Sequence, residues 1–406
     1  MLIEYFTPNF PVRSDKICMF DLDGTLITTK SGCKFPKTSS DWKWLNNDII
    51  PSLKSIVNGA ADAKLVIVII SNQKTSENNK SKVKLIMSKL KSVFNTLVQE
   101  LGSRANICLY AATAADKYRK PSTGIFEDKI YPLMSDDTVL FYVGDAAGRD
   151  GDFSDSDRKF AYNIQLYLNY KKAKTKISFY TPETYFKIDN DNTGVVNCTW
   201  RGFNPKKYMD DNMTEHTSID RIYDASGFTL IVLVGPQASG KSTYAKRNFV
   251  DDGPTGASYD YFSLDAIPQK PNYDSVFIEF VLLAKKKKKL GVVVDATNAD
   301  IFKRDRWLKH YDLFQNMYII VFPGSELDKQ SPYLKHMNTV RSRLSDVVEI
   351  PDVAYSMFYK KYKAPQEFEF HKSIKLKRGD YAIIELEELP ISFSSKKHLM
   401  YFLQLS

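Results

Sequence analysis

The sequence predicts an α/β protein of two domains, each built on a parallel β-sheet. Continuous apolar runs rich in β-branched residues recur along the 406 residues, as at 65–73 and 290–298. Such runs are typical of strands that are buried on both faces. Segments of helical character, such as 80–101 and 276–289, lie between these runs. This alternation indicates parallel sheets, whose ligands bind beyond the carboxyl ends of the strands.

We expect a first domain over 1–188 and a second over 227–406, separated by a segment at 189–226. This segment is rich in Asn, Asp, Gly and Thr and has no clear period, which is typical of a loop. It is either a linker or a packed strap between the domains. Trp200 and Phe203 favour the strap, because aromatic side chains usually seek burial.

Composition and charge restrict the class of protein. The four cysteines are scattered and form no CxxC pair, which argues against a disulfide framework or a zinc site and for a reducing, intracellular setting. No signal peptide is visible, and no stretch reaches the roughly 18 apolar residues of a membrane-spanning helix. A membrane partner is therefore not expected. The net charge of +9 suits a polyanionic partner such as nucleic acid.

The first candidate site follows the apolar run at 16–20, in the motif Asp-Leu-Asp-Gly-Thr at 21–25. A carboxylate at a strand end, here Asp21, can attack phosphorus as a nucleophile. Asp23, two residues further on, can protonate the leaving oxygen and later activate water. Gly24 lets the chain turn sharply after the strand. The motif therefore predicts phosphoryl transfer.

Polar residues also end the next predicted strands. Ser71 and Asn72 offer a hydroxyl and an amide that could hold phosphate oxygens, and Lys120 supplies a cation for the phosphoryl group. Asp145 offers a carboxylate for a hard divalent cation. Mg²⁺ usually takes one or two carboxylates together with phosphate and water oxygens, so we expect Mg²⁺ as the cofactor of this site.

A second candidate site lies at 235–242, where Gly-Pro-Gln-Ala-Ser-Gly-Lys-Ser fits the pattern G-x-x-x-x-G-K-[ST] between a strand and a helix. Backbone amides of such a P-loop cradle phosphates, Lys241 reaches the outer phosphates, and Ser242 binds Mg²⁺. The motif predicts a kinase with ATP as phosphate donor. The predicted nucleotide contacts are Gly235, Ser239, Gly240, Lys241, Ser242 and Thr243.

Charged residues downstream of the P-loop complete this prediction. Asp265 follows a short apolar stretch and would accept a proton from the attacking hydroxyl. Asp295 ends the run at 290–295, where a P-loop enzyme often has its second acid. Arg341 lies on a basic helical stretch that would fold over ATP as a lid.

The first set of motifs resembles the haloacid dehalogenase superfamily. The resemblance implies that Asp21 is the nucleophile and Asp23 the acid/base. It also implies that Mg²⁺ is held by Asp21, the Asp23 carbonyl and Asp145. Asp150 and Asp152 are alternatives for a further acid near the metal, and the sequence does not choose between them.

The two sites in this order closely resemble the eukaryotic polynucleotide kinase 3′-phosphatase family, over about residues 15–405. FDLDGTLITTKSG, FPKTSSDW, SNQ, YRKP, VGDAAGR, DFSDSDRKFAYN, TPETYF, the P-loop and VVVDATNAD carry the resemblance. It implies a nuclear DNA-repair enzyme that removes a 3′-phosphate from DNA strand-break ends and transfers the ATP γ-phosphate to a 5′-hydroxyl. Asp265 would be the kinase base and Arg341 the lid arginine, while Arg304 and Arg306 would lie near the acceptor-strand phosphate.

We expect the chain to differ from the family in two ways. The phosphopeptide-binding module of the animal enzyme is not expected, because the first motif strand begins by residue 16. Leu264 stands where the family often has an arginine, so that contact is either missing or supplied by another residue such as Lys270. We expect a monomer.

Three other functions are alternatives to DNA-end healing. RNA-end repair by the same chemistry is the main alternative, because discrimination of the 2′-hydroxyl depends on local contacts. Intact candidate catalytic residues disfavour an inactive scaffold. The basic charge and the resemblance over the whole chain disfavour a metabolite kinase fused to a small-molecule phosphatase.

Overall fold

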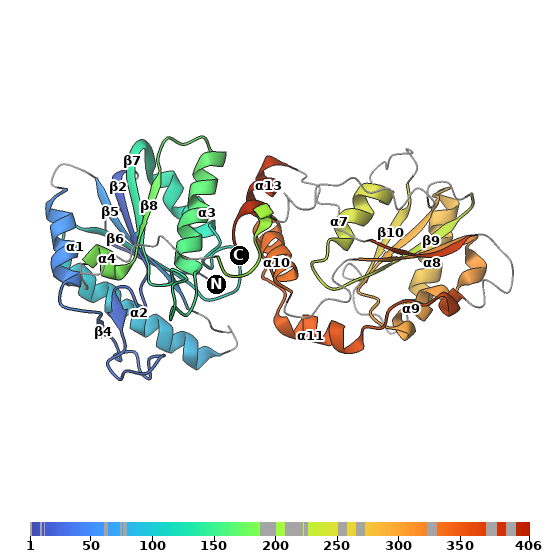
Figure 1. Cartoon of the computed structure of the whole chain (residues 1–406), viewed down its shortest axis with the longest axis horizontal. Coiled ribbons are helices and arrows are strands. Elements are labelled where there is room, and N and C mark those ends of the chain that lie inside the picture. The colour runs from blue at the N-terminus through green and yellow to red at the C-terminus, as the bar shows by residue number, and fades with distance from the viewer. Residues whose placement is uncertain are drawn as a thin grey trace. The chain divides into compact units, whose positions relative to one another are not determined.

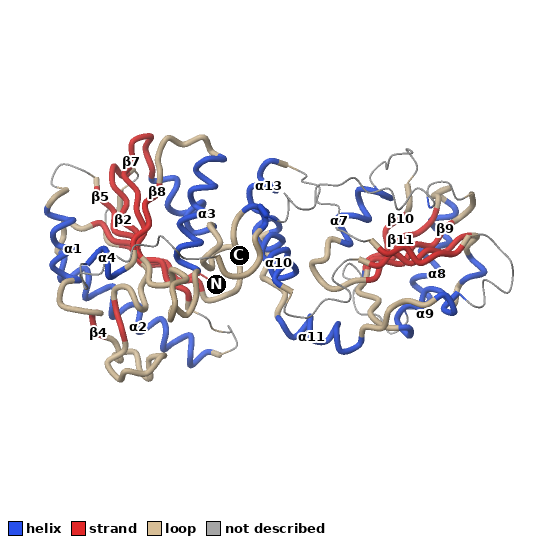
Figure 2. The backbone as a smooth tube through the Cα atoms, in the orientation of Figure 1, coloured by secondary structure: helices blue, strands red, loops and turns tan. Residues whose placement is uncertain are grey.

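The computed structural model describes residues 2–186 apart from 9, 12, 61–63, 74 and 76–78, and then 200–207, 222, 226–250, 258–264, 273–322, 331–370, 380–386 and 395–406. These residues form two compact units. Each unit is built around one sheet, as the strands in Figure 2 show. The predicted α/β class is confirmed.

The sheet of the first unit has the strand order β1-β6-β5-β2-β7-β8. Only β1 runs antiparallel to its neighbour. The strands are β1 (Leu2–Phe6), β2 (Ser14–Phe20), β5 (Leu65–Asn72), β6 (Asn106–Ala112), β7 (Met134–Val143) and β8 (Ile177–Tyr180). A separate two-stranded hairpin joins β3 (Ile27–Thr28) and β4 (Lys43–Trp44).

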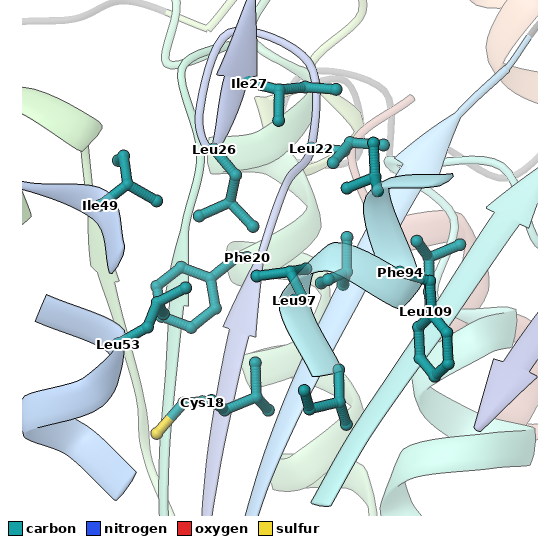
Figure 3. Packing of buried hydrophobic residues seen from close by; sticks show 14 of the residues in the cluster. Cys18, Phe20, Leu22, Leu26, Ile27, Ile49, Leu53, Phe94, Leu97 and Leu109 are labelled. Carbon is teal, nitrogen blue, oxygen red and sulfur yellow. The ribbon is translucent and has the colours of Figure 1, made fainter. Parts of the chain in front are cut away.

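Helices cover both faces of this sheet (Figure 1). They are α1 (Ile49–Asn58), α2 (Lys80–Leu101), α3 (Ser156–Tyr170) and α4 (Pro182–Phe186). Cys18 and Phe20 of β2 point into the core cluster that contains Leu53 of α1 and Leu97 of α2 (Figure 3). Because successive side chains of a strand alternate between faces, Ile17 and Met19, which are also fully buried, face the other side.

The sheet of the second unit is parallel throughout, with the order β10-β11-β9-β12-β13. Its strands are β9 (Thr229–Val234), β10 (Asp260–Ser263), β11 (Gly291–Asp295), β12 (Asn316–Val321) and β13 (Tyr381–Glu385). Its described helices are α7 (Lys241–Ala245), α8 (Tyr273–Lys286), α9 (Ile301–Leu308) and α11 (Asp352–Lys361), together with the first part of α10 (Pro332–Ser345). Separate core clusters lie on the two faces: Val232 belongs to one, and Ile231 and Leu233 to the other.

The compact units do not coincide with the predicted domains. Residues 339–349, which include the end of α10, and the segment 393–406, which includes α13 (Lys396–Leu403), belong to the first unit although they lie within the predicted second domain. Buried Asn163 of α3 shows how the last segment is held. Its side chain accepts a hydrogen bond from the Leu405 amide (2.7 Å) and donates to the Leu405 carbonyl (2.8 Å). The periodicity of a short helix does not specify which unit it joins.

Most of the predicted interdomain segment 189–226 lies outside the described residues. Within its described part, Trp200 packs against Tyr162 (5.3 Å between ring centroids), and the Arg158 guanidinium lies 4.0 Å from the Trp200 ring. Phe203 makes an edge contact with Phe402 of α13. These aromatic side chains therefore pack within the first unit. No helix among the described residues is long and apolar enough to cross a membrane.

Candidate active sites

The first site forms where three neighbouring parallel strands end. Asp21 follows β2, Ser71 lies at the end of β5, and Asp145 follows β7 after Gly144, so the strand order β5-β2-β7 brings the three to one edge of the sheet. Gly24 has φ +89°, and a Cβ atom at this position would lie 2.5 Å from Asp145 Oδ2. A glycine is therefore required here both by the backbone conformation and by the close approach of the Asp145 carboxylate.

Lys120 is the cation at the centre of this site. Its buried ammonium group, which has three protons to donate, lies within hydrogen-bond distance of four acceptors: Asp21 Oδ1 (2.5 Å), Asp157 Oδ1 (2.8 Å), the Tyr142 hydroxyl (2.8 Å) and the Ile70 carbonyl (2.9 Å). Burial acts to lower the pKa of Lys120, but the Asp157 and Asp21 carboxylates raise it above its ordinary value. The structure thus brings the predicted phosphoryl-binding lysine together with the predicted nucleophile.

Asp157 is a residue of this site that sequence reasoning missed. It lies in the first turn of α3 and is almost fully buried. Its carboxylate accepts hydrogen bonds from the Tyr142 hydroxyl (2.7 Å) and the Ala146 amide (3.0 Å), in addition to the bond from Lys120. The stretch DFSDSDRKFAYN contributes to the family resemblance, but the resemblance implies no role for its third aspartate, Asp157.

The three acids of this site form a cluster that suits a divalent cation. One carboxylate oxygen from each of Asp21, Asp145 and Asp157 lies within 4.8 Å of the other two. Burial raises the pKa of Asp21 well above its ordinary value, and the charges of Asp157 and Asp145 raise it further against the opposing effect of Lys120. Burial, followed by the charge of Asp157, raises the pKa of Asp145 to about 6. Crowded carboxylate oxygens of this kind fit Mg²⁺, which prefers hard oxygen ligands.

Asp23 lies apart from this cluster and is held by two other side chains. Its own side chain is 48% exposed. Lys89 Nζ of α2 donates to both carboxylate oxygens, Oδ1 at 2.9 Å and Oδ2 at 3.2 Å. Gln73 Nε2 donates to Asp23 Oδ2 (2.5 Å) and to Ser71 Oγ (2.7 Å). Neither Lys89 nor Gln73 was predicted as a site residue.

The Asn72 side chain, which was expected to bind phosphate, instead bonds to the backbone of Lys120. Its side-chain amide donates to the Lys120 carbonyl and accepts from the Lys120 amide, both at 3.0 Å. These two bonds fix the loop that carries Lys120. A contact between Asn72 or Ser71 and a phosphate stays a prediction.

Neither Asp150 nor Asp152 belongs to the acid cluster formed by Asp21, Asp145 and Asp157. Asp152 accepts hydrogen bonds from the Ala147 amide and the Arg149 side chain, which hold its pKa below the ordinary value despite partial burial. It therefore braces the loop after β7. Asp150 is exposed on this loop. Among the described residues, the third acid that joins Asp21 and Asp145 is Asp157.

The second site is the P-loop between β9 and α7. Gly235 donates its amide proton to the Thr297 carbonyl (3.2 Å), and Gly240 adopts φ +88° just before α7. Lys241 is buried, and its Nζ atom donates to the Pro236 carbonyl (2.6 Å) and approaches Ser239 Oγ (3.4 Å). The loop thus curls back over its own lysine. Ser242 and Thr243 are exposed at the start of the helix.

The end of β11 meets this loop at Asp295. Ser242 Oγ donates to Asp295 Oδ2 (2.5 Å), and the Tyr261 hydroxyl of β10 donates to the same oxygen. Burial, followed by the bond to Asp295, raises the pKa of Tyr261 to about 12, so the phenol keeps its proton near neutral pH. Ser242 and Asp295 are therefore placed together, as a shared Mg²⁺ site requires. Tyr261 was not predicted from the sequence.

The prediction for Arg304 is wrong. This residue is fully buried, and Nε and Nη2 donate to the two Glu369 carboxylate oxygens at 2.7 Å each. Nη1 donates to the Asn298 carbonyl (3.0 Å). All three guanidinium nitrogens are thus committed inside the unit, since a buried arginine needs such partners, and none is available to an acceptor strand.

The remaining predicted residues have other settings. Arg306 is partly exposed, and its guanidinium carbon lies 5.3 Å from the Tyr273 ring. Arg341 is exposed on the part of α10 that belongs to the first unit. Asp265 and Lys270 lie outside the described residues, so their roles stay predictions. Leu264, just before them, packs at the edge of a core cluster of the second unit.

Comparisons with known proteins agree with the geometry of both sites. The family model described as polynucleotide kinase 3 phosphatase matches residues 16–186. The chain is 32% identical over 355 residues to a bifunctional polynucleotide phosphatase/kinase of Schizosaccharomyces pombe, covering 87% of this chain and 77% of the relative. A putative enzyme of the same description from Acanthamoeba polyphaga mimivirus is 27% identical over 392 residues, with 88% and 82% covered. A polynucleotide 3′-phosphatase of Saccharomyces cerevisiae is 30% identical over 223 residues, which is 41% of this chain and 92% of that protein.

Proposed function

The chain belongs to the polynucleotide kinase 3′-phosphatase family, and from this premise we propose that it heals DNA strand breaks. It is a bifunctional enzyme: the first unit removes a 3′-phosphate, and the second transfers a phosphate to a 5′-hydroxyl. The observation that carries the proposal is the presence of two separately built phosphoryl-transfer sites on one chain, the Asp21–Lys120 cluster and the P-loop with Asp295. Together the two products are the ends that a ligase joins.

The contacts of the first-site residues support the following phosphatase reaction. Asp21 attacks the phosphorus and the bond to the 3′-oxygen breaks, while Asp23 gives that oxygen a proton. Asp23 then takes a proton from water, whose oxygen attacks the aspartyl phosphate and restores free Asp21. Lys120 lies against Asp21 and neutralises charge on the phosphoryl group. When bound at Asp21, Asp145 and Asp157, with the Asp23 carbonyl as a further predicted ligand, Mg²⁺ would neutralise charge on the phosphoryl oxygens.

The kinase reaction is catalysed mainly by positioning and charge. The P-loop amides and Lys241 hold the outer phosphates of ATP, the donor we propose. Ser242 and Asp295 would share a second Mg²⁺. Asp265 would accept the proton of the attacking 5′-hydroxyl.

An exposed group of aromatic and basic side chains on the first unit supports a nucleic-acid substrate. Phe35 and Phe153 are 73% and 82% exposed, Phe35 on the connection between β3 and β4 and Phe153 on the loop between Asp145 and α3. Lys34 Nζ lies 4.0 Å from the Phe153 ring centroid and 5.9 Å from that of Phe35. Aromatic faces stack on unpaired bases, and lysines contact the phosphate backbone.

The experiment that tests the function uses a nicked duplex bearing 3′-phosphate and 5′-hydroxyl ends, incubated with the protein, Mg²⁺ and ATP. We expect both ends to be converted, and the ends to become substrates for ligase. Asp21→Asn and Lys241→Ala serve as controls that remove one activity each. If neither end changed with the wild-type protein, the proposal would be wrong. A matched RNA substrate converted faster than DNA would favour RNA-end repair.

Two further proposals concern the setting of the enzyme. We place it in the nucleus, because DNA ends are its proposed substrate, and imaging of a fluorescent fusion tests this. We also propose that it is a monomer, and sedimentation in solution tests this.

A further inference from the structure

A buried lysine contacts the predicted acid/base of the phosphatase site. Lys89 lies on α2, where the residues that face the core are Ile86, Lys89, Leu90, Val93, Phe94, Leu97 and Leu101. Six of these seven are apolar, so Lys89 occupies a position at which helical periodicity calls for an apolar side chain. The Lys89 side chain is only 2% exposed. Lysine is among the residues least often found fully buried without a partner.

The partner of this lysine is the Asp23 carboxylate. Lys89 Nζ reaches both of its oxygens, and Gln73 Nε2 reaches Oδ2 from a second direction. Gln73 is itself fixed, since its side chain also donates to Ser71 Oγ and its amide donates to the Ala112 carbonyl. Asp23 is therefore held by donors from α2 and from the end of β5, although nearly half of its side chain is exposed.

Packing alone does not account for a lysine at this position. Replacing a buried ion pair by apolar residues of similar volume is often neutral or stabilising. The neighbouring helix positions are already filled by residues of the same core cluster as Leu22 and Leu26 (Figure 3). A leucine or methionine at 89 would extend this cluster. The contact with Asp23 is thus the feature that distinguishes lysine from these alternatives.

We propose that Lys89 is a positioning residue of the phosphatase, which aims the Asp23 carboxyl group at the 3′-oxygen and then at the attacking water. The inference rests on the proposed phosphatase function. When Asp23 gives its proton to the 3′-oxygen, the negative charge that appears on its carboxylate is met by the Lys89 ammonium group. When water is later deprotonated, the proton returns to Asp23. Preorganised charge of this kind stabilises the transition state without rearrangement.

The main test is a double-mutant cycle on 3′-phosphate release. Misplacement of a reacting group by about 1 Å can cost up to roughly 10²-fold in rate, so Lys89→Met should lower kcat by about 10–100-fold with little change in KM. Introduced into Asp23→Asn, the same change should cost less than about twofold, because the group through which Lys89 acts is already gone. Lys91→Met is the matched control, since Lys91 is an exposed lysine on the same helix.

A second substrate separates positioning from a purely structural role. p-Nitrophenyl phosphate has a leaving group that needs little protonation, so Lys89→Met should impair its cleavage less than that of a DNA 3′-phosphate. Thermal unfolding of each variant shows whether the first unit, which contains Lys89, is folded. Lys89→Gln is the second neutral variant.

Several outcomes would overturn the inference. Equal losses from Lys89→Met in the wild-type and Asp23→Asn backgrounds would show that Lys89 acts without Asp23. If a folded Lys89→Met variant had the kcat of the wild-type protein, the Lys89–Asp23 ion pair would have no role in catalysis. If neither Lys89→Met nor Lys89→Gln folded, the role of Lys89 would be to stabilise the fold rather than to position Asp23. Absence of phosphatase activity in the wild-type protein would instead refute the proposed function.

Discussion

Asp157→Asn tests the residue that the sequence did not identify. Asp157 accepts from Lys120 and the Tyr142 hydroxyl through one oxygen and from the Ala146 amide through the other. An asparagine has one acceptor oxygen and one donor NH₂ group. Whichever way it turns, its NH₂ group faces another donor, either the Lys120 ammonium or the Ala146 amide. The substitution therefore breaks the network while it keeps the shape of the side chain.

The size of the effect follows from the bonds that are lost. A hydrogen bond to a charged group contributes about 1.5–3 kcal/mol, and each 1.4 kcal/mol corresponds to about tenfold in rate. The reaction needs the Lys120 ammonium group in contact with Asp21. If the lost 1.5–3 kcal/mol weakens the hold on this group, phosphatase kcat should fall by roughly 10–150-fold. Kinase activity should not change, because none of these residues belongs to the second unit.

The assay is steady-state release of phosphate from a 3′-phosphorylated nick, with kinase activity measured on the same preparation. Asp155→Asn is the matched control: Asp155 is also buried, two residues earlier, but it pairs with Lys159 at 3.2 Å. Phosphatase activity of Asp157→Asn within threefold of wild type would refute the assignment. A loss of similar size in Asp155→Asn would show that any buried charge at the start of α3 has this effect.

Three other predictions concern separability, metal binding and stability. Asp21→Asn should abolish phosphatase and keep kinase activity, and Lys241→Ala should do the reverse; loss of both activities in either folded variant would mean that the sites are coupled. Because the pKa of Asp145 is raised to about 6 and a carboxyl group binds metal only after losing its proton, the Mg²⁺ concentration for half-maximal phosphatase should rise about tenfold per pH unit below pH 6. Mg²⁺ titrations at pH 5 and 7 check this, and identical curves would contradict it. Asn163→Ala removes the two bonds to Leu405 and a third to the Pro121 carbonyl and leaves backbone groups unpaired, so the first unit should lose about 2–4 kcal/mol of stability, measured by urea unfolding; an unchanged midpoint would show that these bonds do not stabilise the unit.

The elements that sequence reasoning recovered are those with strong local signals. Continuous apolar runs ended in Asp21, Ser71 and Asp295, and the structure places all three at strand ends. Adjacency of parallel strand ends then brought the predicted nucleophile and Asp145 together. These features depend on the order of residues along one strand and the turn that follows it.

The residues that were missed or misassigned depend on contacts between distant segments. Lys89 is one of many lysines on a helix rich in them, and only its pairing with a residue 66 positions away identifies it. Arg304 looked available for substrate because its partner Glu369 lies 65 positions further along the chain. The sequence of α13 does not indicate that this helix packs against α3 of the first unit. Local patterns do not encode such pairings.

The return of residues 393–406 to the first unit has a consequence for synthesis of the chain. About 185 residues, 208–392, leave the ribosome after residue 207 and before this segment begins to emerge. At 5–20 residues per second, translation of that interval takes roughly 10–40 s. During this time Asn163 lacks its bonds to Leu405, and Thr123 lacks its bond from Gln404. The first unit, although it begins first along the chain, therefore cannot complete its packing until residues 393–406 have been synthesised.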